Sequence, residues 1–156
     1  MIGLDVGDKR IGVAAADELG LTAQGLPTII RHKPDDDLDQ VIRIIQERKA
    51  SLLVVGFPKN MNGSVGLQGE KVIGFVDSLL CRMRESGLDE PAIVYWDERL
   101  TTVAAQRTLL EADLSRKKRK GAVDRLAAVL ILQGYLDREY HKRNSIKNAT
   151  IDNNTH

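Results

Sequence analysis

The sequence has few of the residues that build cross-linked or metal-stabilised small proteins. Cys81 is its only cysteine, which excludes an internal disulfide and a cysteine-rich zinc site and favours a reducing compartment. The three histidines, His32, His141 and His156, form no HxH or HxxxH pair, so a histidine-built metal site is not expected. Aromatic residues make up only 4% of the chain, so base stacking is not expected to dominate any binding of nucleic acid.

Long apolar runs are also missing. No run approaches the ~20 residues that a membrane-spanning helix needs, and no cationic segment precedes an apolar stretch at the N-terminus, as it would in a signal peptide. We therefore expect a cytoplasmic protein without a membrane segment. The 156 residues suit one domain, expected over residues 1–140. The Asn-rich, polar segment 141–156 is expected to be a disordered tail.

Positive charge is concentrated near the C-terminus. The formal net charge is +1, yet residues 1–112 carry a net charge of −4 and residues 113–156 a net charge of +5. Much of the excess lies in the run Arg116–Lys120, five consecutive cations. Such a run must face solvent or an anion. It is consistent with a solvated loop or with a contact to the phosphate backbone of nucleic acid.

The apolar pattern predicts an α/β fold with a mixed sheet. Short apolar runs predict strands at residues 2–6, 11–16, 26–31, 52–55 and 92–96. Helical spacing predicts helices from Pro34, across residues 72–83, from Thr101 or Thr102 to about 112, and over about 121–140. Three consecutive strands followed by alternating helices and strands indicate a three-stranded meander extended by parallel strands, with helices on both faces.

Three carboxylates occupy positions that suggest chemistry. Asp5 lies within an apolar strand, Glu98 follows the end of another strand beside Asp97, and Asp124 falls in the first turn of the most apolar helix. Strand ends are where sites gather in such sheets, and Mg²⁺ prefers carboxylate oxygens as ligands. Each residue also has a structural interpretation. Asp5 would pair with Lys9 or Arg10, and Glu98 would pair with Arg99. Asp124 would be an aspartate at a helix start, where the helix dipole stabilises a negative charge.

Four motifs resemble those of one family, the YqgF (RuvX) proteins. They are the segments 3–14 (GLDVGDKRIGVA), 54–64 (VVGFPKNMNGS), 97–102 (DERLTT) and 117–128 (KKRKGAVDRLAA). They occur in order and span about residues 1–138. Phe57 departs from the family pattern, in which Leu is common before the proline, and this position is not expected to touch the chemistry.

The resemblance implies a fold, an activity and a set of site residues. The family has a ribonuclease H-like fold and is taken to consist of Mg²⁺- or Mn²⁺-dependent nucleases that mature the 5′ end of 16S rRNA, although its members were earlier assigned as Holliday junction resolvases. Carried over by motif, the catalytic and metal-binding residues are Asp5, Glu98 and Asp124. Asp97 is the alternative to Glu98, which the family pattern favours.

The same resemblance suggests residues that contact nucleic acid. They are Lys9 and Arg10 after the first strand, Lys59 and Asn60 on the glycine-rich loop, Arg99 beside Glu98, and Lys117, Lys118, Arg119 and Lys120 of the basic run. Arg99 is equally consistent with holding a carboxylate in place. The expected partner is structured RNA such as pre-16S rRNA, or branched DNA, with ribosomal particles as further candidates and a monomer or homodimer as the assembly. A non-catalytic, RNA-binding ribosome-assembly factor is the alternative from another class.

Overall fold

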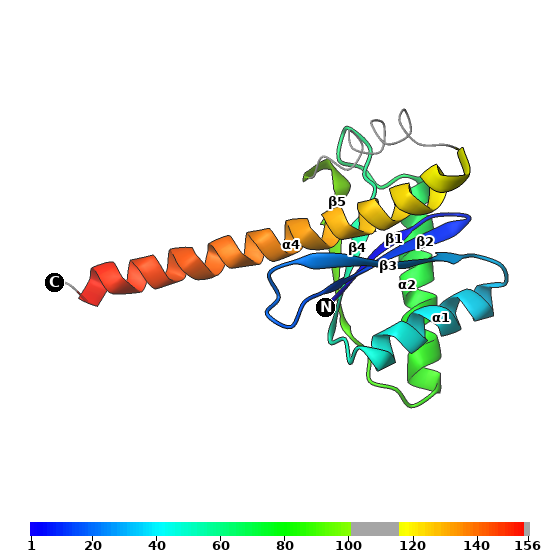
Figure 1. Cartoon of the computed structure of the whole chain (residues 1–156), viewed down its shortest axis with the longest axis horizontal. Coiled ribbons are helices and arrows are strands. Elements are labelled where there is room, and N and C mark those ends of the chain that lie inside the picture. The colour runs from blue at the N-terminus through cyan, green and yellow to red at the C-terminus, as the bar shows by residue number, and fades with distance from the viewer. Residues whose placement is uncertain (101–115, 155–156) are drawn as a thin grey trace.

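A computed structural model describes residues 1–100 and 116–154, which form a five-stranded sheet flanked by helices (Figure 1). The strands are β1 (Ile2–Val6), β2 (Arg10–Ala16), β3 (Ala23–Ile30), β4 (Leu52–Phe57) and β5 (Ala92–Asp97). The helices are α1 (Pro34–Glu47), α2 (Leu67–Glu85), the single 3₁₀ turn η1 (Glu98–Leu100) and α4 (Arg116–Asn154).

The sheet is mixed, with the strand order β3-β2-β1-β4-β5. Strands β1, β2 and β3 pair antiparallel as a meander, and β4 adds parallel to β1 and β5 parallel to β4. The parallel crossovers need helices to connect them, and α2 is the connection from β4 to β5. This arrangement confirms the expected meander followed by alternating helices and strands.

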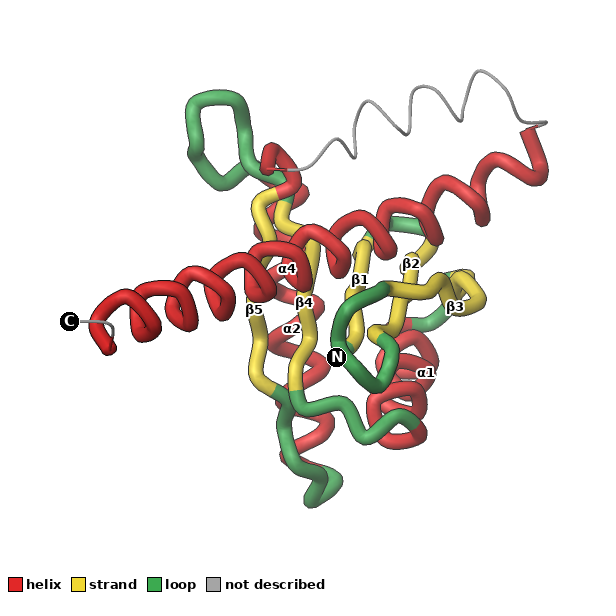
Figure 2. The backbone as a smooth tube through the Cα atoms, turned by 60° about the vertical axis from the view of Figure 1, so that its left-hand side comes forward, coloured by secondary structure: helices red, strands yellow, loops and turns green. Residues whose placement is uncertain are grey.

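Helices cover both faces of the sheet (Figure 2). Helices α1 and α2 pack on one face, where their apolar side chains join Ile2, Leu4 and Val6 of β1 in one buried cluster. Helix α4 crosses the other face and forms a second cluster with Val54 and Trp96. Burying each large aliphatic side chain contributes ~1.5–3 kcal/mol to the free energy of folding. Because Ile2, Leu4 and Val6 lie on the same face of β1, this energy keeps that face against α1 and α2.

Helix α4 approaches β1 very closely because Gly3 has no side chain. A Cβ atom added at Gly3 would lie 2.7 Å from the Cβ of Leu132 and 3.0 Å from the carbonyl oxygen of Ala128. Side chains on a strand alternate between its faces. Asp5 therefore shares the α4 face with Gly3, while Leu4 and Val6 face α1 and α2.

Helix α4 is longer than the sequence pattern predicted. It begins at Arg116 rather than near residue 121 because Arg and Lys are good helix formers. Where a disordered tail was expected, residues 141–154 continue the helix to Asn154 and project from the body of the protein (Figure 1). Once a helix has nucleated, each added residue gains a hydrogen bond. The helix predicted at 101–112 lies outside the described residues. Within the described ranges, no helix combines the length and apolarity needed to cross a bilayer.

Candidate functional site

Two of the predicted acids lie at the same edge of the sheet, Asp5 near the carboxyl end of β1 and Glu98 just after β5, with β4 between these strands. Asp5 of β1 is buried, with 9% of its surface exposed, on the face that α4 covers. Leu4 of β1 pairs with Val55 of β4, so the next step along both strands places Asp5 beside Gly56. Neighbouring strands are about 4.8 Å apart.

Glu98 reaches over Gly56 from the end of β5. A Cβ atom added at Gly56 would lie 2.8 Å from Oε1 of Glu98 and would also meet the Cδ1 atom of Ile131 on α4. The Glu98 carboxylate therefore occupies the space above Gly56, on the same face as Asp5. The two carboxylates, 93 positions apart in the sequence, come from adjacent parts of one sheet edge.

Asp97 has a different role from Glu98. It follows Trp96, whose side chain is buried under α4, so alternation turns Asp97 toward the opposite face. There its carboxylate binds the guanidinium of Arg99, with 2.7 Å between Oδ2 and Nη2 and 3.0 Å between Oδ1 and Nε. These bonds hold the pKa of Asp97 below its ordinary value. Geometry thus favours Glu98 over Asp97 as the partner of Asp5.

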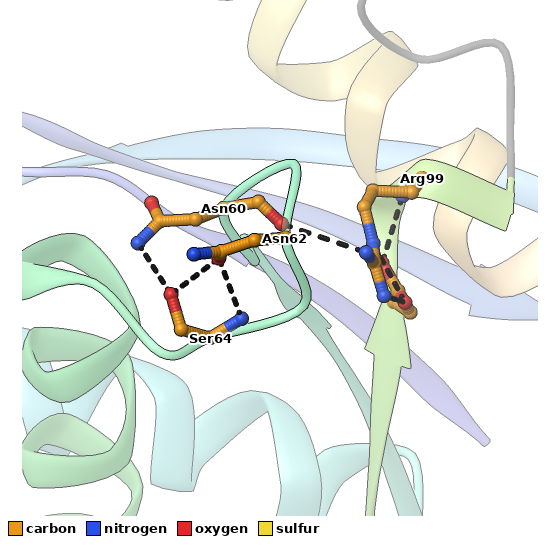
Figure 3. A network of polar contacts seen from close by, with 5 residues as sticks. Asn60, Asn62, Ser64 and Arg99 are labelled. Atoms are coloured by element: carbon orange, nitrogen blue, oxygen red, sulfur yellow. Dashed lines mark hydrogen bonds and ion pairs between the residues drawn. The ribbon is translucent and has the colours of Figure 1, made fainter.

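Arg99 also connects β5 to the loop after β4 (Figure 3). Its Nη1 lies 3.5 Å from the carbonyl oxygen of Asn60. The loop is closed by a 3.0 Å hydrogen bond that the Asn60 N–H donates to the Ser64 carbonyl. The Asn62 side chain accepts hydrogen bonds from the Ser64 backbone N–H and hydroxyl at 3.0 and 2.6 Å. The glycine-rich loop is therefore an ordered turn beside the strand ends.

The predicted cations lie on several different elements. Lys9 is exposed in the turn between β1 and β2, and Lys59 is exposed at the start of the loop after β4. Arg10 opens β2 and is partly buried. The basic residues Lys117, Lys118, Arg119 and Lys120 lie in the first turns of α4, and their side chains are outside the described part of the chain.

The donor atoms at this edge suit a hard divalent cation. Asp5 and Glu98 offer carboxylate oxygens, the ligand type that Mg²⁺ and Mn²⁺ prefer. Asp124 lies in α4, one turn before Ala128, with its side chain outside the described residues. Among the residues that the structure describes, no three Asp, Glu, His or Cys side chains gather as a metal cluster.

Gly56 lies at this edge of the sheet, and its sequence position alone did not point to it. Its missing side chain makes room for the Glu98 carboxylate. The signal was present, because a glycine inside an apolar strand often marks a close approach. The approaching group could not be named before the pairing of β4 with β5 was known.

Comparison with known proteins gives consistent matches over most of the chain. Residues 1–138 match the family model described as "RuvX: Holliday junction resolvase". A relative from Clostridioides difficile, named "Putative pre-16S rRNA nuclease", is 56% identical over 137 residues, which cover 88% of this chain and 93% of the relative. Relatives of the same name from Clostridium novyi and Halothermothrix orenii are 56% and 52% identical, with 97% and 94% of their lengths covered.

Solved structures share the architecture at low sequence identity. The RuvC protein of T. thermophilus, solved in complex with a Holliday junction substrate, aligns with a TM-score of 0.51 at 15% identity. The alignment covers 89% of this chain and 96% of RuvC. This likeness concerns the fold.

Proposed function

This chain belongs to the RuvX family of nucleases, and from this premise we propose that it cleaves a phosphodiester bond near the 5′ end of pre-16S rRNA. The family resemblance, the ribonuclease H-like α/β fold and the enzyme class, a hydrolase of phosphodiester bonds, are confirmed. The curated relatives carry the name pre-16S rRNA nuclease, which supports RNA as the substrate.

The observation that carries the proposal is the approach of two acids at one sheet edge. Asp5 and the Glu98 carboxylate share the face under α4, above adjacent strands, and Gly56 leaves the space that Glu98 fills. Two carboxylates brought together raise each other's pKa and repel unless a cation lies between them. We assign Asp5, Glu98 and Asp124 as the residues that hold Mg²⁺ or Mn²⁺.

Each residue then has a separate task. Divalent cations, when bound, lower the pKa of water and stabilise the charge that develops on a phosphodiester. Asp5 and Glu98 would hold those ions, one carboxylate from β1 and the other from the turn after β5. Backbone phosphates would be neutralised by Lys9, by Lys59 and by Lys117, Lys118, Arg119 and Lys120 of the basic run. Arg10, Asn60 and Arg99 would make further contacts to the nucleic-acid backbone. Such contacts recognise phosphate and shape rather than sequence.

Cleavage of a defined precursor tests the proposal. We would incubate the full chain with a 5′-extended 16S rRNA fragment and either Mg²⁺ or Mn²⁺, beside the variant Asp5→Asn. The matched control is Asp89→Asn, which makes the same change at an exposed position before β5. Metal-dependent cleavage by the wild type and by Asp89→Asn, and its loss in Asp5→Asn, is the expected result.

A four-way DNA junction is the second substrate in that experiment, because the matching family description names a Holliday junction resolvase. Preferential cleavage of the junction by a dimer would replace RNA with branched DNA as the substrate. Binding of RNA that survives in Asp5→Asn, with no cleavage of either substrate, would indicate a ribosome-assembly factor. The proposed compartment is the cytoplasm, where rRNA precursors and ribosomal particles occur together in bacteria.

A further inference from the structure

The turn between β1 and β2 begins two residues after Asp5 and is closed by a short hydrogen-bonded connection. The Gly7 N–H donates a 2.9 Å hydrogen bond to the carbonyl oxygen of Arg10. A Cβ atom added at Gly7 would lie only 2.8 Å from that oxygen. The turn presents Lys9 to solvent. Its conformation therefore sets both the end of the strand that carries Asp5 and the direction of a candidate phosphate-binding cation.

Arg31, just after β3, holds this turn at two points. Its backbone N–H donates a 2.9 Å hydrogen bond to the carbonyl oxygen of Lys9. Its side-chain Nη1 donates a 2.9 Å hydrogen bond to the carbonyl oxygen of Gly7. One residue thus connects both ends of the Gly7–Lys9 segment.

The Arg31 guanidinium is itself fixed by α1 and α2. Its Nε lies 3.1 Å from Oδ2 of Asp37, whose side chain is only 2% exposed. The other oxygen of Asp37 accepts a 3.0 Å hydrogen bond from the His32 N–H. The guanidinium also lies over the ring of Phe75, 5.2 Å from its centroid. A charged pair this buried is costly to misplace, since either partner left alone would be an uncompensated charge.

A second ion pair at the turn lacks these properties. Lys71 of α2 lies 3.3 Å from Asp8, but their side chains are 50% and 62% exposed. Exposed pairs of this kind constrain a backbone weakly. Arg31 is therefore the group that transmits the position of the α1–α2 layer to the turn.

We infer that Arg31, oriented by Asp37, is a positioning residue for the nuclease site: it fixes the Gly7–Lys9 turn and through it Asp5 and Lys9. This inference rests on the proposed function. Arg31 lies among residues of the α1–α2 layer, on the face opposite the one that Asp5 and Glu98 share. It acts on the reaction through the backbone of the turn, without touching RNA.

The test compares Arg31→Gln and Arg31→Lys with Arg82→Gln. Arg82 also joins α1 and α2, through bonds to Asp39 at 2.6 and 2.9 Å, but it makes none to the turn. In Arg31→Gln we expect kcat for precursor cleavage to fall ~10–100-fold. Mn²⁺ should bind more weakly and the Gly7 amide should exchange with solvent faster. Arg31→Lys should recover little of the lost kcat, because a lysine ammonium lacks the planar guanidinium that donates hydrogen bonds to both Asp37 and the Gly7 carbonyl. All rates are measured well below each variant's melting temperature.

Outcomes separate this inference from the proposed function. If Arg82→Gln loses kcat as Arg31→Gln does, or if Arg31→Gln keeps wild-type kcat, Mn²⁺ affinity and Gly7 exchange, the positioning role is overturned. If the wild type cleaves no RNA, the proposed function fails. Mn²⁺ affinity and Gly7 exchange in Arg31→Gln then decide the inference alone, with wild-type values for both overturning it.

Discussion

At the scale of single residues, the site depends on which acid faces α4. Glu98 lies over Gly56, on the side of Asp5, whereas Asp97 is bound to Arg99. Sequence alone could not separate the two, because adjacent acids at a strand end differ only in the face that they meet. The structure separates them through strand alternation.

Substitution of the two neighbouring acids should have unequal effects on cleavage. We expect Glu98→Gln to lower kcat more than about 100-fold, since a carboxylate proposed to bind the catalytic metal ion is lost. We expect Asp97→Asn to lower it less than about 10-fold, since only the position of Arg99 changes. Steady-state cleavage of the rRNA precursor measures both. Equal losses in the two variants would contradict the assignment.

Gly56→Ala should disturb the site without changing any charged group. The added methyl would lie in the space of Oε1 of Glu98 and of the Cδ1 of Ile131. We expect cleavage to fall at least ~10-fold and unfolding to cost ~1–3 kcal/mol less, as for other overpacked cores. Thermal unfolding and initial rates are the measurements. Full activity in this variant would show that Glu98 does not need the space above Gly56.

Acid should remove the contribution of the Asp97–Arg99 pair to stability. Arg99 lowers the pKa of Asp97 below its ordinary value of 3.8. The pair therefore stabilises the fold above that ordinary value, and the gain is lost as the pH falls through the lowered pKa. Melting temperatures of wild type and Asp97→Asn from pH 7 to pH 2 should differ by a constant amount down to about pH 5 and converge below pH 3.8. Convergence between pH 7 and pH 5 would contradict this account.

At the scale of elements, α4 is the helix that covers the proposed site. It covers β1 at Gly3 and β4 at Gly56, and it contains Asp124 and the basic run. Leu136 is the last residue of α4 in the buried apolar cluster with the sheet, and the Arg138 guanidinium lies over the ring of Trp96 on β5, 4.9 Å from its centroid. The first half of α4 is thus part of the fold, and the last turns project from it (Figure 1).

Gly3→Ala should displace α4 as a unit. The new Cβ would come within 3.0 Å of the backbone oxygen of Ala128 and closer still to Leu132, and backbone cannot yield as a side-chain tip can. We expect unfolding to cost ~1–3 kcal/mol less and precursor cleavage to fall, because Asp124 shifts with the helix. Denaturant unfolding and cleavage rates report the two effects. A variant as stable and active as the wild type would mean that α4 does not pack as described.

Deletion of residues 145–156, unlike Gly3→Ala, should leave both stability and cleavage nearly unchanged. The described side chains from Ser145 to Ile151 are all exposed, so their removal takes little apolar surface from the fold. We expect the melting temperature and the cleavage rate to stay near those of the full chain while helical circular dichroism decreases. A large loss of stability would show that the projecting turns of α4 pack against the body.

At the scale of the whole molecule, local patterns predicted more than long-range geometry. The strands, the helix from Pro34 and the mixed topology followed from apolar spacing and turn residues. The length of α4 did not, because Asn, Ser and Thr are weak helix formers and the composition of residues 141–154 suggested disorder. The approach of Glu98 to Asp5 also did not, because it depends on the pairing of β1 with β4 across 45 intervening residues and of β4 with β5 across 34.

The measurement that tests the account most directly is the Mn²⁺-dependent cleavage rate of a 5′-extended 16S rRNA fragment by the wild type, Asp5→Asn and Asp89→Asn. We expect cleavage by the wild type and Asp89→Asn at similar rates, and a loss of more than about 100-fold in Asp5→Asn with its melting temperature retained. Cleavage by folded Asp5→Asn at the wild-type rate would contradict the assignment of the site to this edge of the sheet.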